Sequence, residues 1–149
     1  MKPISAVIQG QDTAVVPRTA SVVDAVRIMT ARNIGAVPVV DDERLVGIFT
    51  ERDVMARVVA VGLDPKNTEV GDVMSPDLVT ADVRDTCDTC LRRLQQARVR
   101  HLIVLNEGRL AGVLSLRDLL AVDADEKDEA INLLNAYVHY IPADLARKA

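Results

Sequence analysis

Aromatic side chains are almost absent from this chain, whose 149 residues include no Trp, one Phe and two Tyr. A nucleic-acid surface that stacks bases on aromatic rings therefore has almost no material to work with. The formal net charge of −4 also disfavours broad attraction to nucleic acid or to an anionic membrane surface. We expect neither of them as a partner.

Long apolar runs are missing as well, and the chain has only two cysteines. Its longest apolar runs are far shorter than a membrane span, and its first residues lack the apolar region of a secretory signal. Two cysteines do not make a disulfide framework and are typical of a reducing compartment. With 49% hydrophobic and 27% charged residues, the composition predicts a soluble globular protein, which we expect in the cytoplasm.

An internal repeat is the most informative feature that is present. Residues 47–54 (GIFTERDV) return as residues 112–119 (GVLSLRDL), an offset of 65 positions (112 − 47). Each copy reads glycine, two apolar residues, a hydroxyl residue, any residue, Arg-Asp and an apolar residue; we call this pattern the signature. Two copies in one register predict a pair of globular modules with equivalent sites.

The segments that flank the two signatures are related by the same offset of 65 positions. Residues 21–34 carry a helical apolar stripe that recurs near residues 87–94, and Ser21 with Asp24 forms a helix-start capping pair. In each half, two apolar runs joined by a polar turn predict a β-hairpin, and the second strand of that hairpin leads into the signature. With first strands near 13–17 and 78–81, each half is predicted as strand-helix-strand-strand-helix. The first signature's helix is predicted to stop at Gly62.

The predicted fold class is therefore α/β, with two pseudo-twofold-related repeats at 4–62 and 63–122. Neither repeat buries enough apolar surface alone, so we expect their sheets to pack face to face and helix faces to form a homodimer. Residues 123–149 are predicted as an acidic linker and a C-terminal helix. The apolar residues of that helix should pack on the module or on a partner subunit: Leu133, Leu134, Tyr137, Val138 and Ile141.

The two signatures, with the DVMSP segment at 72–76 and the apolar segment at 33–40, resemble the cystathionine-β-synthase (CBS) domain, which occurs in tandem pairs. The resemblance covers about residues 4–122. It implies a non-catalytic regulatory module that binds AMP, ADP, ATP, NAD or S-adenosylmethionine in the cleft between paired domains, and a flat dimer. No catalytic cofactor is expected. Because the chain ends after the tail, the regulated protein is expected to act in trans.

Chemistry assigns roles to the signature residues. The carboxylates of Asp53 and Asp118 can each accept hydrogen bonds from both ribose hydroxyls. Thr50 and Ser115 lie at strand-to-helix corners, where hydroxyl and N–H groups can meet ribose or phosphate. Arg52 and Arg117 match phosphate geometry. The resemblance further places the adenine between strand residues, which are by position Ala36, Val37, His101 and Leu102.

The signature and the cysteine pair each allow a second interpretation. Thr50-x-x-Asp53 and Ser115-x-x-Asp118 also have the form of helix capping boxes, which a structural dimerisation module without a ligand would need equally. Cys87 and Cys90 have the spacing of a thiol oxidoreductase motif. The repeat disfavours that motif, because the equivalent positions are Val22 and Ala25. No paired catalytic carboxylates, nucleophile–His arrangement, P-loop or metal-ligand set is visible, so we expect no enzyme and no metal site.

Overall fold

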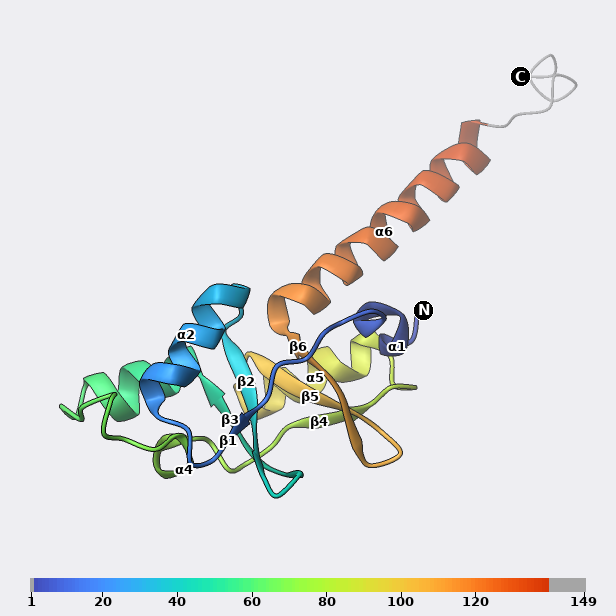
Figure 1. The fold of residues 1–149 in the computed structure, drawn as a ribbon. Coiled ribbons are helices and arrows are strands. Elements are labelled where there is room, and N and C mark those ends of the chain that lie inside the picture. The colour runs from blue at the N-terminus through green and yellow to red at the C-terminus, as the bar shows by residue number, and fades with distance from the viewer. Residues whose placement is uncertain (1, 140–149) are drawn as a thin grey trace, which may run out of the picture.

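The computed structural model describes residues 2–139, and for residues 137–139 it describes the backbone only. Figure 1 shows two similar halves followed by one long helix. The first half contains α1 (Ile4–Ile8), β1 (Val16–Pro17), α2 (Val22–Arg32), β2 (Ala36–Asp41), β3 (Arg44–Thr50), α3 (Glu51–Asp53) and the π-helix η1 (Val54–Val59). The second contains α4 (Val70–Val73), β4 (Thr80–Asp82), α5 (Cys87–Ala97), β5 (His101–Asn106), β6 (Arg109–Ser115) and α6 (Leu116–His139). The predicted strand-helix-strand-strand-helix order is confirmed in both repeats.

The helices α2 and α5 begin and end in the same way. Ser21 Oγ accepts the Asp24 N–H at 3.2 Å, and Thr86 Oγ1 accepts the Thr89 N–H at 3.4 Å. Both helices end in a left-handed residue, Asn33 or Arg98, whose N–H bonds back to the last turn. Each helix buries the apolar stripe predicted from the sequence.

Each half contains one three-stranded sheet, with β1-β2-β3 in the first and β4-β5-β6 in the second. The first strand is parallel to the second, and the second and third form the predicted antiparallel hairpin. The register places Ala36 opposite Thr50 and His101 opposite Ser115. The hairpin register therefore puts the hydroxyl residue of each signature beside the start of its neighbouring strand.

The two sheets meet through an apolar cluster that contains residues of both hairpins. Ala36, Ile48 and Ile103 are its buried members, and Leu45, Leu78, Leu105 and Leu110 pack against them. Burial of these side chains favours association of the halves, at about 25 cal/mol per Å² of apolar surface removed from water. The expected packing of the two sheets is confirmed.

The segments that open the two repeats are exchanged between the halves. Ile4 and Ile8 of α1 lie in the core of the second half, where Ile4 N–H donates to Asp85 O at 3.0 Å. Val70 and Val73 of α4 lie in the core of the first half, where Val70 N–H donates to Ala20 O at 2.8 Å. Each core is thus completed by residues from the other sequence repeat.

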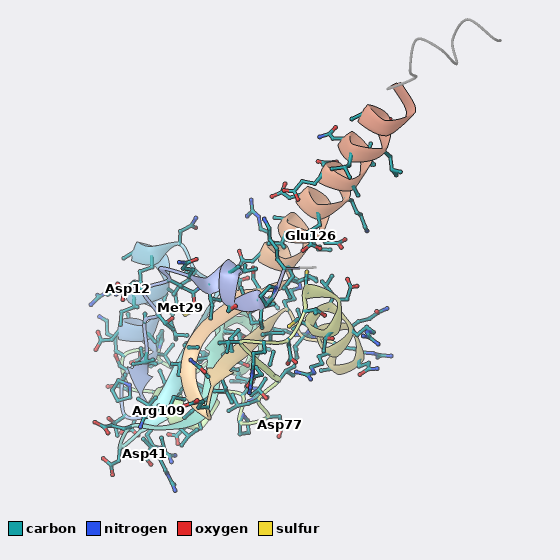
Figure 2. The ribbon with its side chains drawn as sticks, turned by 90° about the vertical axis from the view of Figure 1, so that its right-hand side faces the viewer. Asp12, Met29, Asp41, Asp77, Arg109 and Glu126 are labelled. Carbon is teal, nitrogen blue, oxygen red and sulfur yellow. The ribbon has the colours of Figure 1, made fainter. Side chains whose placement is uncertain are left out.

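The helices that follow the two signatures differ. The first becomes the π-helix η1, and Gly62 follows it with a φ of +76°, at the stop predicted from the sequence. The second, α6, runs from Leu116 to His139 and projects away from the sheets in both views (Figures 1 and 2). The acidic stretch 123–129 is part of α6, where an ion pair joins Lys127 Nζ to Asp123 Oδ2 at 2.8 Å. A pair at this i,i+4 spacing supports helix formation.

The apolar face expected on the tail is solvent-exposed in the part that the structure describes. Ile131, Leu133 and Leu134 are 53%, 77% and 62% exposed, so they do not pack on the sheets. The side chains of Tyr137 and Val138, and all of Ile141, lie outside the described residues. Among the helices that are described, none is both long and apolar enough to cross a membrane.

Cys87 and Cys90 are core residues of the second half and both are fully buried. The Cys87 thiol donates to Leu119 O at 3.3 Å. Burial raises the pKa of Cys87, and it raises the pKa of Cys90 to about 11. Because the thiolate is the reactive form, this environment disfavours an oxidoreductase role and favours that of small apolar side chains.

We predict that both cysteines resist alkylation while the protein is folded. A thiol with a pKa of about 11 is about one-thousandth ionised at pH 8, and burial restricts access further. Iodoacetamide labelling followed by mass spectrometry should therefore give slow modification that becomes fast in concentrated guanidinium chloride. Rapid labelling of the native protein, or a reversible Cys87–Cys90 disulfide, would contradict this.

Candidate functional site

Both signatures form capping boxes at the start of their helices. Thr50 N–H donates to Asp53 Oδ2 at 3.0 Å and Asp53 N–H donates to Thr50 Oγ1 at 3.2 Å. The bonds between Ser115 and Asp118 repeat this pattern, both at 3.0 Å. The hydroxyl and the carboxylate of each signature therefore have a structural role whether or not a ligand binds.

The signature glycines are explained by close packing. A Cβ atom at Gly47 would lie 2.9 Å from Ser75 O and closer still to the Met74 side chain, and one at Gly112 would lie 2.8 Å from Gln11 Oε1. At Gly47 the neighbouring backbone would have to move, whereas at Gly112 the end of the Gln11 side chain could shift. Gly47 thus admits the segment that opens the second repeat. Among residues 2–139, neither Arg52 nor Arg117 has a carboxylate oxygen within 4.0 Å.

Asp53 is the one buried charged residue among those that the structure describes, with 5% of its surface exposed. Besides the Thr50 N–H, its carboxylate accepts the Ser75 hydroxyl at 2.9 Å on Oδ1 and at 3.2 Å on Oδ2. Arg57 Nε lies 3.7 Å from Oδ1 and is held there by a bond from the guanidinium to Met74 O at 2.7 Å. Hydrogen bonds and a cation thus compensate the burial of this charge.

Asp118, the equivalent residue, has a different environment. It is exposed, and among residues 2–139 no side chain donates to its carboxylate. By the repeat offset the counterpart of Ser75 is Gly10, which has no hydroxyl to offer. Next to it, the Gln11 amide pairs with Val113, accepting its N–H at 2.8 Å and donating to its carbonyl at 3.0 Å. In the first half, the backbone of Ser75 forms the corresponding pair with Ile48.

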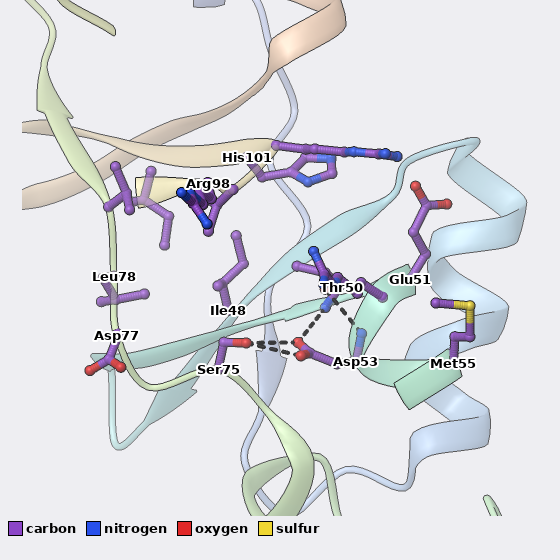
Figure 3. Close-up of a pocket in the computed structure, with 15 residues that line it drawn as sticks. Ile48, Thr50, Glu51, Asp53, Met55, Ser75, Asp77, Leu78, Arg98 and His101 are labelled. Atoms are coloured by element: carbon purple, nitrogen blue, oxygen red, sulfur yellow. Dashed lines mark hydrogen bonds between the residues drawn. The ribbon is translucent and has the colours of Figure 1, made fainter. Parts of the chain in front are cut away.

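A cavity of about 700 Å³ lies between the halves at the first signature (Figure 3). Its apolar wall is formed by Ile48, Met55, Leu78, Val79, Val99 and Ile103. Its polar lining consists of Thr50, Glu51, Arg52, Asp53, Ser75, Asp77, Arg98, Arg100 and His101. The lining therefore combines one signature with the linker before β4 and with the turn that joins α5 to β5.

The predicted site residues divide into three groups. The cavity brings together Thr50, Arg52, Asp53 and His101. The side chains of Ala36, Val37 and Leu102 are buried in the apolar cores. The third group, which is not part of this lining, consists of Ser115, Arg117 and Asp118.

The sequence analysis did not propose the cavity residues Glu51, Ser75, Asp77, Arg98 and Arg100 as site residues. For Arg98 and Arg100, the comparison of the two repeats gives a signal in the sequence. Positions 98, 100 and 101 are Arg, Arg and His, whereas the equivalent positions 33, 35 and 36 are Asn, Gly and Ala. The second repeat thus has three basic side chains where the first repeat has small or neutral ones.

His101 lies at the junction of the two halves. A Cβ atom at Gly35 would be 3.3 Å from His101 Nε2 and 3.0 Å from Glu51 Oε1, so this glycine leaves room for both side chains. Burial lowers the pKa of His101; the carboxylates of Glu51 and Asp118 oppose that shift and Arg100 adds to it. Burial thus favours the neutral imidazole, which has one donor and one acceptor nitrogen.

Comparison with known proteins gives one consistent family. A model of the CBS domain matches residues 7–60 and 70–125. The mitochondrial CBS domain-containing protein CBSX3 of Arabidopsis thaliana is 32% identical over 123 residues, which are 79% of this chain and 60% of that protein. The chain thus spans less than two thirds of this relative's length.

Two solved structures give the same result for the fold. A protein with CBS domains from Burkholderia ambifaria MC40-6 is 31% identical with a TM-score of 0.78, covering 83% of this chain and 96% of that one. The CBS domain protein PAE2072 from Pyrobaculum aerophilum, complexed with AMP, has a TM-score of 0.71 at 24% identity, covering 78% of this chain and 89% of that one. With both repeats matched by the family model, the chain belongs to the CBS-domain family.

Proposed function

We propose that this protein is a regulatory module that binds an adenosine-containing ligand in the cavity at the first signature. The observation that carries the proposal is the composition of that cavity: the signature residues Thr50, Arg52 and Asp53 face basic residues from the other repeat. Its volume of about 700 Å³ lies in the range of small-molecule sites, about 300–1,000 Å³. We propose that a separate protein reads the occupancy of the cavity.

The cavity has a suitable surface for each part of such a ligand. The adenine would lie against its apolar wall, where it removes apolar surface from water. The ribose hydroxyls would donate to Asp53, and the first phosphate would lie near Arg52, whose guanidinium has no carboxylate within 4.0 Å among the described residues. A protein of the same fold carries AMP, which agrees with this class of ligand.

Binding at Asp53 competes with an internal contact. The Ser75 hydroxyl already donates to both carboxylate oxygens, so a ribose must share or displace that donor. Among the described residues, only Oδ2 of the Asp118 carboxylate accepts a hydrogen bond. We propose Asp118 as the ribose acceptor of a second, independent site. Ser115 and Arg117 would act at that site as Thr50 and Arg52 do at the first. By the same resemblance, the strand backbones at Ala36, Val37, His101 and Leu102 are proposed to contact the adenines.

We predict that Asp53→Asn weakens binding of the adenosine ligand about tenfold or more, because a charge-assisted acceptor is lost. Asparagine has the size of aspartate and fits this buried position, where a glutamate would crowd Ser75.

At the exposed second signature, Asp118→Glu should keep near-normal stability, since glutamate suits a capping box, and should weaken binding at that site by a similar factor. Isothermal titration calorimetry with AMP, ATP, NAD and S-adenosylmethionine measures both.

Two controls separate binding from folding. Ser21→Ala removes the N-cap bond to the Asp24 N–H of α2, outside the cavity lining, so it should lower stability and preserve affinity. Asp42→Asn changes an exposed turn residue with a φ of +46°, which asparagine tolerates, and should change neither. If no adenosine compound binds the unmodified protein at millimolar concentration, the capping boxes are only structural and the proposal is wrong.

We also propose a homodimer that forms through the helices after the signatures. Met55 and Leu120 occupy equivalent repeat positions on these helices and are 62% and 50% exposed. Val59 on η1 is 67% exposed, and Ile131, Leu133 and Leu134 on α6 are 53%, 77% and 62% exposed. Exposed apolar side chains on these helices are available for a protein–protein contact.

We predict that Leu120→Glu shifts the protein to a monomer, because the interface would then bury a charge without a partner. Light scattering after size-exclusion chromatography measures the mass, and circular dichroism tests whether the variant is folded. Val15→Glu, at a 43% exposed position before β1, is the matched control and should remain a dimer. A monomeric unmodified protein at every accessible concentration would contradict the dimer.

A further inference from the structure

The distal part of α6, residues 127–139, projects away from the body of the protein (Figures 1 and 2). Just before it, Glu126 Oε1 accepts the Lys2 backbone N–H at 3.0 Å, which ties α6 to the N-terminal segment. Every residue from 127 to 136 is exposed. The match to the CBS-domain model ends at residue 125, so the distal part of α6 lies outside the matched family region.

A helical segment of this size is not stable by itself in water. Residues 127–139 span 13 positions (139 − 126), and isolated helices shorter than about 12–15 residues are marginal. The segment includes Asn132 and Asn135, which are weaker helix formers than Ala or Leu. In proteins, most helical stability comes from the packing of an apolar face. The distal part of α6 therefore requires a partner for its apolar residues.

One face of α6 carries residues at the spacing of a coiled coil. They follow one another in alternating steps of four and three along the chain, and we call them the α6 stripe: Leu120, Ala124, Lys127, Ile131 and Leu134. In the sequence, Val138 and Ile141 continue these steps. Such a seven-residue repeat is the pattern by which two helices pack along a shared seam. Leu133 is 77% exposed but lies about 100° around the helix from Leu134, and so outside the stripe.

The stripe does not face the body of its own protein. The face of α6 that packs on the second core carries Leu119, which is fully buried, and Val122. On the stripe, Leu120, Ile131 and Leu134 are 50%, 53% and 62% exposed. Leu120, its first residue, also belongs to the proposed homodimer contact. In a homodimer formed there, the two α6 helices would begin side by side, and each stripe would continue outward from the contact.

Lys127 is the one charged residue of the stripe, and its surroundings fit a second copy of α6. Lys127 Nζ lies 2.8 Å from Asp123 Oδ2 of the same helix. With Ala124 and Lys127 on the seam, Asp123 and Asp128 occupy the two positions that flank it. In a parallel pair the flanking positions of one helix approach the other helix, so Asp128 of the second copy would lie near Lys127. A charge on the seam needs such partners, and an identical chain supplies them at the same level.

We infer that α6 pairs in parallel with α6 of a second copy along the stripe, as a two-stranded coiled coil that extends the proposed homodimer. This inference rests on that homodimer and adds a contact beyond the folded body. Lys127 would fix the register, because a shift by one seven-residue step would move Asp128 of the second copy away from it. Asp125 and Glu129 are exposed and fall on positions outside the seam, so their charges stay in water.

The test is amide hydrogen exchange of residues 127–139, measured by mass spectrometry on the full unmodified chain and on single variants. In the unmodified homodimer these amides should exchange slowly, and dilution to the monomer should make their exchange fast. Leu134→Glu puts an unpaired charge on the seam and should speed the exchange about tenfold or more. Leu133→Glu, the same change one residue earlier and outside the stripe, is the matched control and should leave the exchange unchanged.

A second pair of variants tests the parallel arrangement. Asp128→Lys replaces the carboxylate beside each Lys127 by a cation and should speed the exchange of residues 127–139, because like charges would then meet at the seam. Glu129→Lys makes the same change of charge at an exposed position outside the seam and should have little effect.

Light scattering on the same samples separates this inference from the homodimer. A dimeric unmodified protein with fast exchange at residues 127–139, or equal effects of Leu134→Glu and Leu133→Glu, would overturn the coiled coil and leave the homodimer intact. Equal effects of Asp128→Lys and Glu129→Lys would overturn the parallel pairing. A protein that is monomeric at every accessible concentration would overturn the homodimer and the coiled coil together.

Discussion

The pair of backbone hydrogen bonds between Ile48 and Ser75, both 2.9 Å long, joins the segment that opens the second repeat to the sheet of the first. Much of the site depends on this contact. It brings the Ser75 hydroxyl to the buried Asp53, and it directs the next residues, Asp77 to Val79, into the cavity wall. The contact is possible because Gly47 has no Cβ atom where Met74 and Ser75 approach. A side chain at Gly47 would push the linker away and open the cavity on that side.

The two halves share a fold but differ around their signatures. Asp53 is buried and receives a hydroxyl from Ser75, whereas Asp118 is exposed and has Gly10 at the position equivalent to Ser75. The first signature leads into a short π-helix and the second into a helix that leaves the body of the protein. Ser75 and its counterpart Gly10 lie outside the eight-residue pattern. Two nearly identical signatures therefore need not have the same ligand or the same affinity.

The sequence alone determined the repeat, the order of the elements and the identity of the capping residues. These are local properties, because apolar periodicity, hydroxyl–carboxylate spacing and turn composition act over a few residues. The elements predicted in one half also recur in the other half at the 65-residue offset. Of the proposed site residues, the sequence placed Thr50, Arg52, Asp53 and His101 at what proved to be one cavity. It did not distinguish the environments of Asp53 and Asp118, whose local patterns are alike.

Tertiary structure decided which repeat completes which core, and which side chains share the cavity. The exchange of α1 and α4 between the halves depends on contacts such as Ile4 with the second core, which are remote in sequence and leave no local pattern. The same holds for Ser75, which reaches the first signature through its backbone pair with Ile48. It holds as well for Arg98, which reaches the cavity because the two sheets pack against each other at Ile48 and Ile103. Long-range packing carries no periodic signal along the chain, so only the folded chain identifies the partners of a charged group.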